Sequence, residues 1–220
     1  MAKIVGVLNQ KGGCSKTTTA VHVSTAIATL FDLRVALADA DPQASARTWL
    51  SRAEKPIVTV HQVGSEDGKW LKQELADIAA DLVVLDLPPS LEAVSLRAAL
   101  LSDLILLPAG PSPVDISATK AAVSICKEAI DLVPSKKYLL VPSRVQMNTA
   151  LGRDLRKVLS AWGPVAKATI CLRVAYSAAA SFGMGIVEYA PDTPGSEATE
   201  LLAEEVLEIL GLAPKRKPRP

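Results

Sequence analysis

The segment NQKGGCSKTT, Asn9–Thr18, decides the fold of this chain. It follows a short apolar run, Ile4–Leu8, which is typical of a buried strand. It leads into Thr18–Leu30, where small and apolar residues predict a helix. A glycine-rich turn between a strand and a helix presents backbone N–H groups and a positive helix end, and both attract phosphate. The segment therefore predicts a phosphate-binding loop.

The side chains of this loop suit a nucleotide that carries magnesium. Lys16 is placed to reach the β- and γ-phosphates, and the Thr17 hydroxyl is a ligand for Mg²⁺. The small residues before them allow the backbone to turn its N–H groups inward. We therefore expect nucleotide contacts from Gly12, Gly13, Cys14, Ser15, Lys16, Thr17 and Thr18.

One residue of the loop departs from the usual phosphate-loop motif. Ser15 occupies the position before the lysine, where that motif has glycine. If the backbone there is left-handed, a serine costs about 1 kcal/mol, whereas a helical backbone carries no such cost. The sequence leaves both conformations open, and with them the effect on nucleotide affinity and turnover.

Further apolar runs alternate with helical patterns along the chain. Runs that are apolar on both faces and separated by helices predict a doubly wound, mostly parallel α/β sheet with helices on both faces. We expect one domain over residues 1–212 and a disordered, basic, proline-rich tail over 213–220. The expected strands are 4–8, 35–38, 82–86, 104–108, 138–142 and 168–171, and the expected helices are 18–30, 69–80, 91–101, 118–132, 150–162 and 196–210.

Composition excludes several classes of protein. The 220 residues are 49% hydrophobic and 21% charged, which is enough for a core and excludes a disordered chain. Three Trp, three Tyr and two Phe are too few for aromatic platforms that bind single strands. The three cysteines have no CxxC spacing, so no metal or disulfide framework is indicated. No apolar run is long enough to span a bilayer, so we expect no membrane contact and a cytoplasmic location.

Two acidic motifs follow consecutive apolar runs. Asp39 and Asp41 come at the end of the second run, and Asp86 ends the third, before Pro88 and Pro89. In an open α/β sheet, ligands bind at the carboxyl ends of the strands. Mg²⁺ needs few carboxylates there because it keeps several waters. These motifs and the phosphate loop therefore predict one site at the same edge of the sheet.

The loop fits the pattern K-G-G-x-x-K-T, and with the acidic motifs it resembles the ParA/MinD family of deviant Walker-type ATPases. The resemblance extends over about Lys3–Leu212 and is strongest to small ParA-like partition ATPases without an N-terminal helix-turn-helix. It implies ATP and Mg²⁺ as ligands and a homodimer that encloses ATP between its subunits. Lys11 then corresponds to the signature lysine, which reaches the nucleotide of the other subunit.

The resemblance also assigns roles to the other site residues. Asp41 corresponds to the residue that positions the attacking water, and Asp86 to the Walker B carboxylate. The loop Pro108–Asp115 resembles part of a nucleotide-dependent interface, although a stiff strand-to-helix connection is an equal alternative. The implied catalytic residues are Lys11, Lys16 and Asp41, the implied metal-site residues are Thr17, Asp39 and Asp86, and the implied contacts to the base are Arg144, Pro191 and Thr193. A place on the DNA face is the equal alternative for Arg144.

Charge is unevenly distributed although the net charge is only +1. Residues 134–173 hold eight Lys or Arg and one acid, Asp154, whereas residues 174–213 hold seven acids and no Lys or Arg. A basic stripe favours sequence-independent binding to DNA phosphates, as the resemblance also implies, and a solvated helix face is the alternative. The residues that we expect to bind DNA are Arg153, Arg156, Lys157, Lys167 and Arg173.

The resemblance implies an ATPase that positions or segregates a cargo, such as a plasmid, a chromosome region or a protein body like a carboxysome. ATP-bound dimers would bind nucleoid DNA, and a partner of ParB-like role would stimulate slow hydrolysis and release them. One alternative is an ATP-gated scaffold with little turnover. Another is a metabolic phosphate-loop ligase on the same fold, which would lack the lysine that Lys11 supplies.

Overall fold

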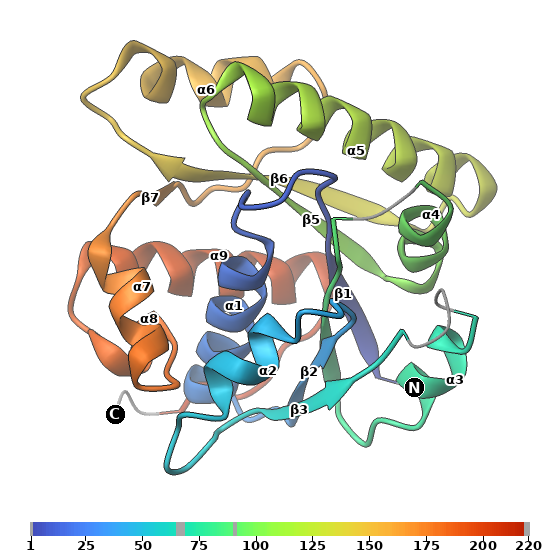
Figure 1. Cartoon of the computed structure of the whole chain (residues 1–220), viewed down its shortest axis with the longest axis vertical. Coiled ribbons are helices and arrows are strands. Elements are labelled where there is room, and N and C mark those ends of the chain that lie inside the picture. The colour runs from blue at the N-terminus through green and yellow to red at the C-terminus, as the bar shows by residue number, and fades with distance from the viewer. Residues whose placement is uncertain (1, 65–68, 90–91, 218–220) are drawn as a thin grey trace.

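A parallel sheet forms the centre of the molecule (Figure 1). The computed structural model describes residues 2–64, 69–89 and 92–217, and within them the sheet has seven strands. All of the neighbouring strands pair in parallel, which confirms the doubly wound α/β fold. In spatial order the strands are β3 (Thr59–Gln62), β2 (Val35–Asp39), β4 (Leu82–Asp86), β1 (Lys3–Val7), β5 (Leu104–Ala109), β6 (Lys137–Val145) and β7 (Ile170–Cys171).

Helices cover both faces of the sheet because the central strands are apolar on both sides. Along β4, Leu82 and Val84 join one core while Val83 and Leu85 join the other, as the alternation of strand side chains requires. The first core is closed by α1 (Lys16–Leu30), α2 (Ser45–Leu50), α7 (Val174–Ser181), α8 (Ile186–Tyr189) and α9 (Pro194–Leu210); the second is closed by α3 (Leu71–Ala76), α4 (Glu92–Leu101), α5 (Pro113–Leu132) and α6 (Ala150–Ser160).

The longest helix, α5, begins earlier than the expected residue 118. Its N-cap is Ser112, whose hydroxyl accepts a hydrogen bond from the backbone N–H of Asp115. Pro113 follows at the first helical position, where its missing N–H costs nothing. The proline-rich loop therefore ends in a capped helix start, and this places Asp115 in the first turn. The expected start of α4 at Leu91 lies outside the described residues.

The end of the described chain packs against the domain, where we expected a disordered tail. Arg216 forms an antiparallel bridge with Phe31, and its guanidinium lies over the Phe31 ring. The same guanidinium pairs with Glu200 at 2.8 Å and also with Glu204. The backbone N–H of Lys217 donates to Leu30 at 2.7 Å. Ion pairs with α9 and backbone hydrogen bonds to the end of α1 thus hold residues up to 217 in place, and the expected tail residues 218–220 lie outside the described part.

The register of the sheet places the acidic motifs beside the phosphate loop. Asp39 of β2 and Asp86 of β4 are direct partners, and Asp86 is also opposite Val7 at the end of β1. The phosphate loop begins after β1, so the loop and both carboxylates meet at one edge. Among the described helices, none combines the length and the hydropathy that crossing a bilayer requires.

Candidate functional site

The phosphate loop resolves the two conformations that the sequence left open for Ser15. Its φ is 73°, which is left-handed, and Gly13 also has a positive φ of 71°. Ser15 is the N-cap of α1, yet its side chain makes no capping hydrogen bond. The loop therefore contains a strained non-glycine residue, at a cost of about 1 kcal/mol.

Lys16 folds over the loop backbone. Its side chain is buried, and its Nζ donates a hydrogen bond to the Lys11 carbonyl at 3.0 Å. Cys14 Sγ lies 3.9 Å from the same Nζ, and burial raises the pKa of the Cys14 thiol above its usual value. A thiol of this kind is a poor nucleophile near neutral pH. A phosphate group would give Lys16 a stronger, charge-assisted partner than the carbonyl it now contacts.

Asp39 is buried but well supplied with donors. Its carboxylate accepts hydrogen bonds from the backbone N–H groups of Asp41 at 3.1 Å and Arg47 at 3.0 Å. Burial raises the pKa of Asp39, and these two donors oppose the rise in part. Asp39 therefore fixes the turn that carries Asp41 toward the phosphate loop. The Asp41 carboxylate in turn accepts from the N–H of Gln43 at 2.9 Å.

Asp86 is buried without such support. Neither of its carboxylate oxygens has a hydrogen-bond partner among the described residues. Burial raises the pKa of Asp86 to about 7, and the charges of Asp39 and Asp41 add to this effect, while Thr17 and Lys16 oppose it. An unpaired buried carboxylate is costly, and a cation beside it removes that cost.

These residues fit a magnesium ion. The fit rests on the unpartnered oxygens of Asp86 together with the Thr17 hydroxyl at the start of α1. No group of three or more His, Cys, Asp or Glu side chains in the described chain is arranged to hold a metal by itself. A cation here would therefore depend on phosphate and water for its other ligands.

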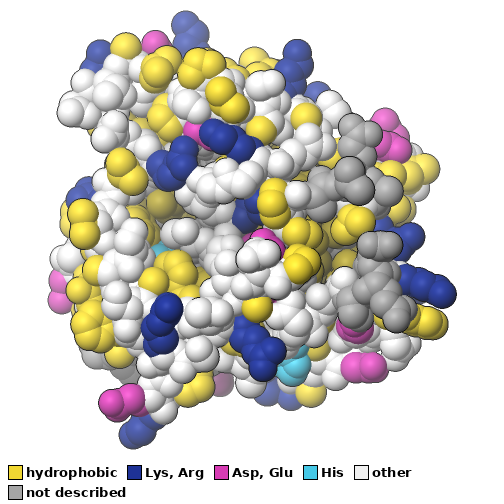
Figure 2. All heavy atoms as spheres, in the orientation of Figure 1, with side chains coloured by type: hydrophobic (Ala, Val, Ile, Leu, Met, Phe, Trp, Pro, Cys, Tyr) yellow, Lys and Arg dark blue, Asp and Glu magenta, His cyan; other side chains and the backbone are white. Residues whose placement is uncertain are grey.

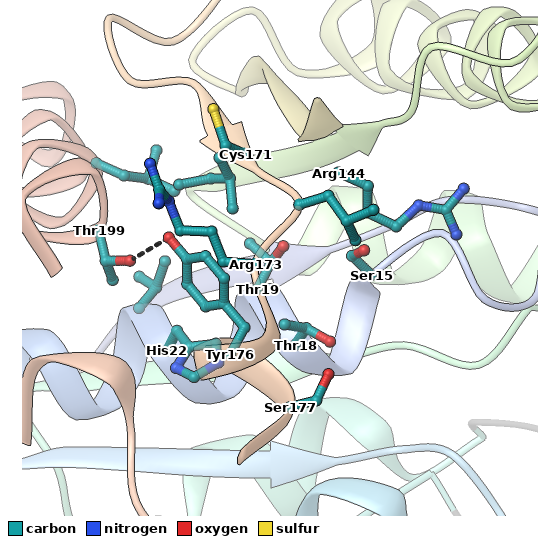
Figure 3. Close-up of a pocket in the computed structure, with 14 residues that line it drawn as sticks. Ser15, Thr18, Thr19, His22, Arg144, Cys171, Arg173, Tyr176, Ser177 and Thr199 are labelled. Atoms are coloured by element: carbon teal, nitrogen blue, oxygen red, sulfur yellow. Dashed lines mark hydrogen bonds between the residues drawn. The ribbon is translucent and has the colours of Figure 1, made fainter. Parts of the chain in front are cut away.

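A cavity of about 130 Å³ opens beside the phosphate loop, between α1 and residues of β7, α7 and α9 (Figure 3). Ser15, Thr18 and Thr19 line one side, and Arg173 and Tyr176 lie across from them. The Tyr176 hydroxyl donates to the Gly195 carbonyl at 2.9 Å and lies 3.2 Å from the Thr199 hydroxyl. Mixed apolar and hydrogen-bonding walls of this kind suit the sugar and base of a nucleotide.

The cavity brings together only part of the expected base-contact set. Arg144 lines it, whereas Pro191 and Thr193 do not. Thr193 instead is the N-cap of α9, where its hydroxyl accepts from the N–H of Ser196. Tyr176 and Thr199 line the cavity without any sequence motif that could have singled them out. The base-contact roles of Pro191 and Thr193 stay predictions.

His22 lies deep in the same wall. Its Nδ1 accepts a hydrogen bond from the Ile186 N–H at 2.9 Å, and its ring packs edge-on against Trp49 and Tyr176. Burial lowers the pKa of His22 to about 3, so the ring is neutral at physiological pH. It connects the cavity with α2, the helix after Asp41.

Asp115 joins the phosphate loop, the start of α5 and the end of β6. Its carboxylate accepts from Lys11 Nζ at 2.6 Å, Arg144 Nη2 at 2.9 Å and Ser112 Oγ at 2.7 Å. Burial by itself would raise the pKa of Asp115, but these partners outweigh it and hold the pKa below its usual value. Sequence analysis missed Asp115 as a functional residue, although it quoted the proline-rich loop that contains it.

The structure divides the expected DNA-binding residues. Arg153, Arg156 and Lys157 are exposed on α6. Figure 2, in the orientation of Figure 1, shows Lys and Arg side chains along the upper edge of the molecule, where Figure 1 places α6. Lys167 pairs with Glu208 at 2.8 Å, which places an acid beside it. Arg173 lines the cavity beside Tyr176. The continuous basic stripe is therefore limited to α6, and DNA contact by these residues stays a prediction.

Comparison with known proteins identifies relatives by sequence. Residues 5–187 match the family described as CobQ/CobB/MinD/ParA nucleotide binding domain. The maintenance of carboxysome distribution protein A of Halothiobacillus neapolitanus is 30% identical over 190 residues, which cover 84% of this chain and 86% of that protein. The chromosome-partitioning ATPase Soj of Thermus thermophilus is 29% identical over 238 aligned positions, covering 92% and 94%.

A comparison of structures agrees on the fold. The septum site-determining protein MinD complexed with Mg-ADP, from Pyrococcus horikoshii OT3, superposes with a TM-score of 0.78 at 19% identity. The superposition covers 96% of this chain and 98% of that one. The extent of the family match, the phosphate loop and the shared sheet agree: the chain belongs to the CobQ/CobB/MinD/ParA family of nucleotide-binding domains.

Proposed function

We propose that this chain is an ATPase that binds ATP with Mg²⁺, dimerises around the nucleotide and uses DNA as a track to position a cargo. The observation that carries the proposal is Asp86, a buried carboxylate without a partner at the end of the strand beside the phosphate loop. The site thus offers buried carboxylate oxygens without a hydrogen-bond partner among the described residues, next to a phosphate-binding backbone. A nucleotide that brings a divalent cation satisfies both.

The site residues divide the work between them. Lys16 would exchange its carbonyl partner for the β- and γ-phosphates, and Thr17 and Asp86 would hold Mg²⁺. When bound, Mg²⁺ neutralises charge on the phosphate oxygens. Asp41, held at its turn by Asp39, would orient the attacking water. Lys11 would reach the nucleotide of a second copy, as the family resemblance implies.

The relatives support the wider role. One is named for maintaining carboxysome distribution and another for chromosome partitioning, so both are named for placing a large object in the cell. The exposed basic residues of α6 suit sequence-independent contact with DNA phosphates. A cargo-bound partner that stimulates slow hydrolysis would release the dimer from DNA.

Retention on non-specific duplex DNA tests the proposal. We expect the wild type to be retained with ATP and Mg²⁺, released with ADP, and released at high salt, because phosphate contacts depend on counterion release. Lys16→Ala should abolish retention. Replacing Arg153 and Lys157 by Ala should weaken it and reduce the salt slope by about one per lost phosphate contact.

Lys3→Ala is the matched control, because Lys3 is exposed and pairs with Asp103 away from α6. It should bind DNA like the wild type. Retention that ignores the nucleotide would contradict ATP gating, and no retention in any state would contradict the DNA track. ATP-dependent dimers with negligible phosphate release would instead favour a scaffold, which the strained Ser15 loop makes a specific alternative.

A further inference from the structure

The Asp115 carboxylate is the most completely paired charged group near the phosphate loop. The side chain has no exposed surface, and two cations and one hydroxyl surround it. The second cation, Arg144, also donates to the Gly13 carbonyl of the phosphate loop. One buried charge therefore ties the phosphate loop, the start of α5 and the end of β6 together.

The neighbouring backbone leaves room for this carboxylate. A Cβ at Gly110 would lie 2.5 Å from Asp115 Oδ2 and 3.3 Å from Arg144 Nη2, so a larger residue there would displace the pair. The main chain around it is also fixed. The Thr119 hydroxyl donates to the Asp115 carbonyl at 2.8 Å, and Asn9 accepts from the Lys11 N–H at 3.1 Å. The geometry therefore gives Lys11 a fixed acceptor, Asp115 Oδ1, while Oδ2 takes Arg144 and Ser112.

Lys11 and Arg144 differ in how firmly they are held. Arg144 has a second acceptor in Gly13, whereas the Lys11 ammonium has Asp115 as its one side-chain partner among the described residues. The Lys11 side chain is 34% exposed, so it can swing outward without unfolding anything. If it leaves, Asp115 keeps Arg144 and Ser112 and is not left unpaired. The network is therefore built to release one cation.

We infer that Asp115 is a positioning residue that holds Lys11 within its own subunit when no nucleotide is bound, and releases Lys11 to the phosphates bound by a second copy of the chain. This inference rests on the proposed function, because it requires Lys11 to act across a dimer. The triphosphate carries more negative charge than one carboxylate and can compete for the ammonium. Asp115 thereby sets the nucleotide concentration at which the dimer forms.

The test measures, by sedimentation, how far the Asp115→Asn variant dimerises as a non-hydrolysable ATP analogue is titrated in the presence of Mg²⁺. The amide keeps the shape and loses the charge, so Lys11 is freed. We expect half-dimerisation at an analogue concentration about tenfold lower than for the wild type, since a charged hydrogen bond exceeds a neutral one by about 1.4 kcal/mol. Gly110→Ala displaces the same carboxylate and should therefore also lower the analogue concentration at half-dimerisation.

Asp103→Asn is the matched control. Asp103 pairs with Lys3 at 3.1 Å, at the amino ends of the strands, and its loss should leave the titration unchanged. Adding Lys11→Ala to Asp115→Asn should abolish the gain, because the effect acts through Lys11. An unchanged or higher threshold in both Asp115→Asn and Gly110→Ala would overturn the inference.

The failure of the proposed function has a different signature. If neither the wild type nor the variants dimerise with the analogue although they bind it, the dimer is refuted and the restraint with it. If the wild type dimerises and both Asp115→Asn and Gly110→Ala dimerise less readily, the dimer stands and the restraint is wrong, because Asp115 would then support Lys11 in the dimer.

Discussion

Asp86 and Asp115 are both completely buried at the carboxyl edge of the sheet, but their surroundings are opposite. Asp115 has Lys11, Arg144 and Ser112 around its oxygens, whereas Asp86 has no hydrogen-bond partner among the described residues. Burial raises the pKa of Asp86 to about 7, while the partners of Asp115 hold its pKa below the usual value. The protein supplies cations for one carboxylate and leaves the other for a ligand to satisfy.

The same substitution at the two positions should have opposite effects on stability. Without nucleotide, Asp86→Asn should raise the free energy of unfolding near neutral pH by about 2 kcal/mol, because it removes a buried charge without a partner. Asp115→Asn should lower it by about 2 kcal/mol, because two cations lose their counter-ion. Asp86→Asn should also reduce ATP turnover by about 100-fold, through loss of the metal site.

Chemical denaturation of both variants and a phosphate-release assay would measure these effects. Asp103→Asn serves as the control: Asp103 is half-buried, and an asparagine there keeps an oxygen that can accept from the Ile4 N–H, so the free energy of unfolding should change by less than about 1 kcal/mol. If Asp86→Asn destabilises the nucleotide-free chain, the contrast between the two carboxylates is wrong.

A buried histidine, His22, extends the comparison of buried titratable groups to acidic pH. Because burial lowers the pKa of His22 to about 3, the unfolded chain binds a proton on this ring before the folded chain does. The stability that the neutral ring contributes is fully present above the pKa of His22 in the unfolded chain. It is lost as the pH falls toward about 3, the pKa of His22 in the folded chain. Between about pH 7.5 and about pH 5 the loss should be about 2 kcal/mol.

Denaturation at the two pH values, for the wild type and His22→Asn, checks this prediction. His22→Asn should reduce the loss on acidification, whereas His61→Asn should leave it unchanged because His61 is exposed. Equal loss of stability on acidification in the wild type and His22→Asn would show that groups other than this ring cause the loss.

The smallest effect concerns backbone strain and not charge. Ser15→Gly should raise the free energy of unfolding by about 0.5–1 kcal/mol, because glycine adopts the left-handed conformation without a Cβ penalty. Ser15→Ala keeps the Cβ and should give no such gain. Thermal unfolding of the two variants separates them, and an equal response from both would place the origin of the effect in the hydroxyl.

Most of the sheet could be predicted because its strands are continuous apolar runs. Leu82–Asp86 matches its prediction, and Leu104–Ala109 differs by one residue. The edge strand Thr59–Gln62 was missed because its side chains are mostly exposed and carry no apolar run. The short helices α2, α7 and α8 were missed for a related reason: too few turns reveal no periodicity.

The residues of the site also divide into those that the sequence could predict and those that it could not. The phosphate loop, Asp39 and Asp86 are local motifs at strand ends, and the parallel register brings them together. The cavity wall at Tyr176 and Thr199 comes from distant helices, and only tertiary packing unites them. Asp115 and Lys11 are 104 positions apart in the chain, so no spacing rule could pair them. Pairwise contacts of this kind follow from the sheet order, which the sequence could not supply.

The packed chain end has a practical consequence for imaging. Residues 215–217 lie along the end of α1, with Arg216 over Phe31 and Lys217 bonded to Leu30. A fluorescent protein joined directly behind this segment would pull on the contact and loosen the helix that begins at the phosphate loop. Labels for tracking the molecule in cells therefore belong behind a long, flexible spacer, and a shortened gene should keep its codons through Lys217.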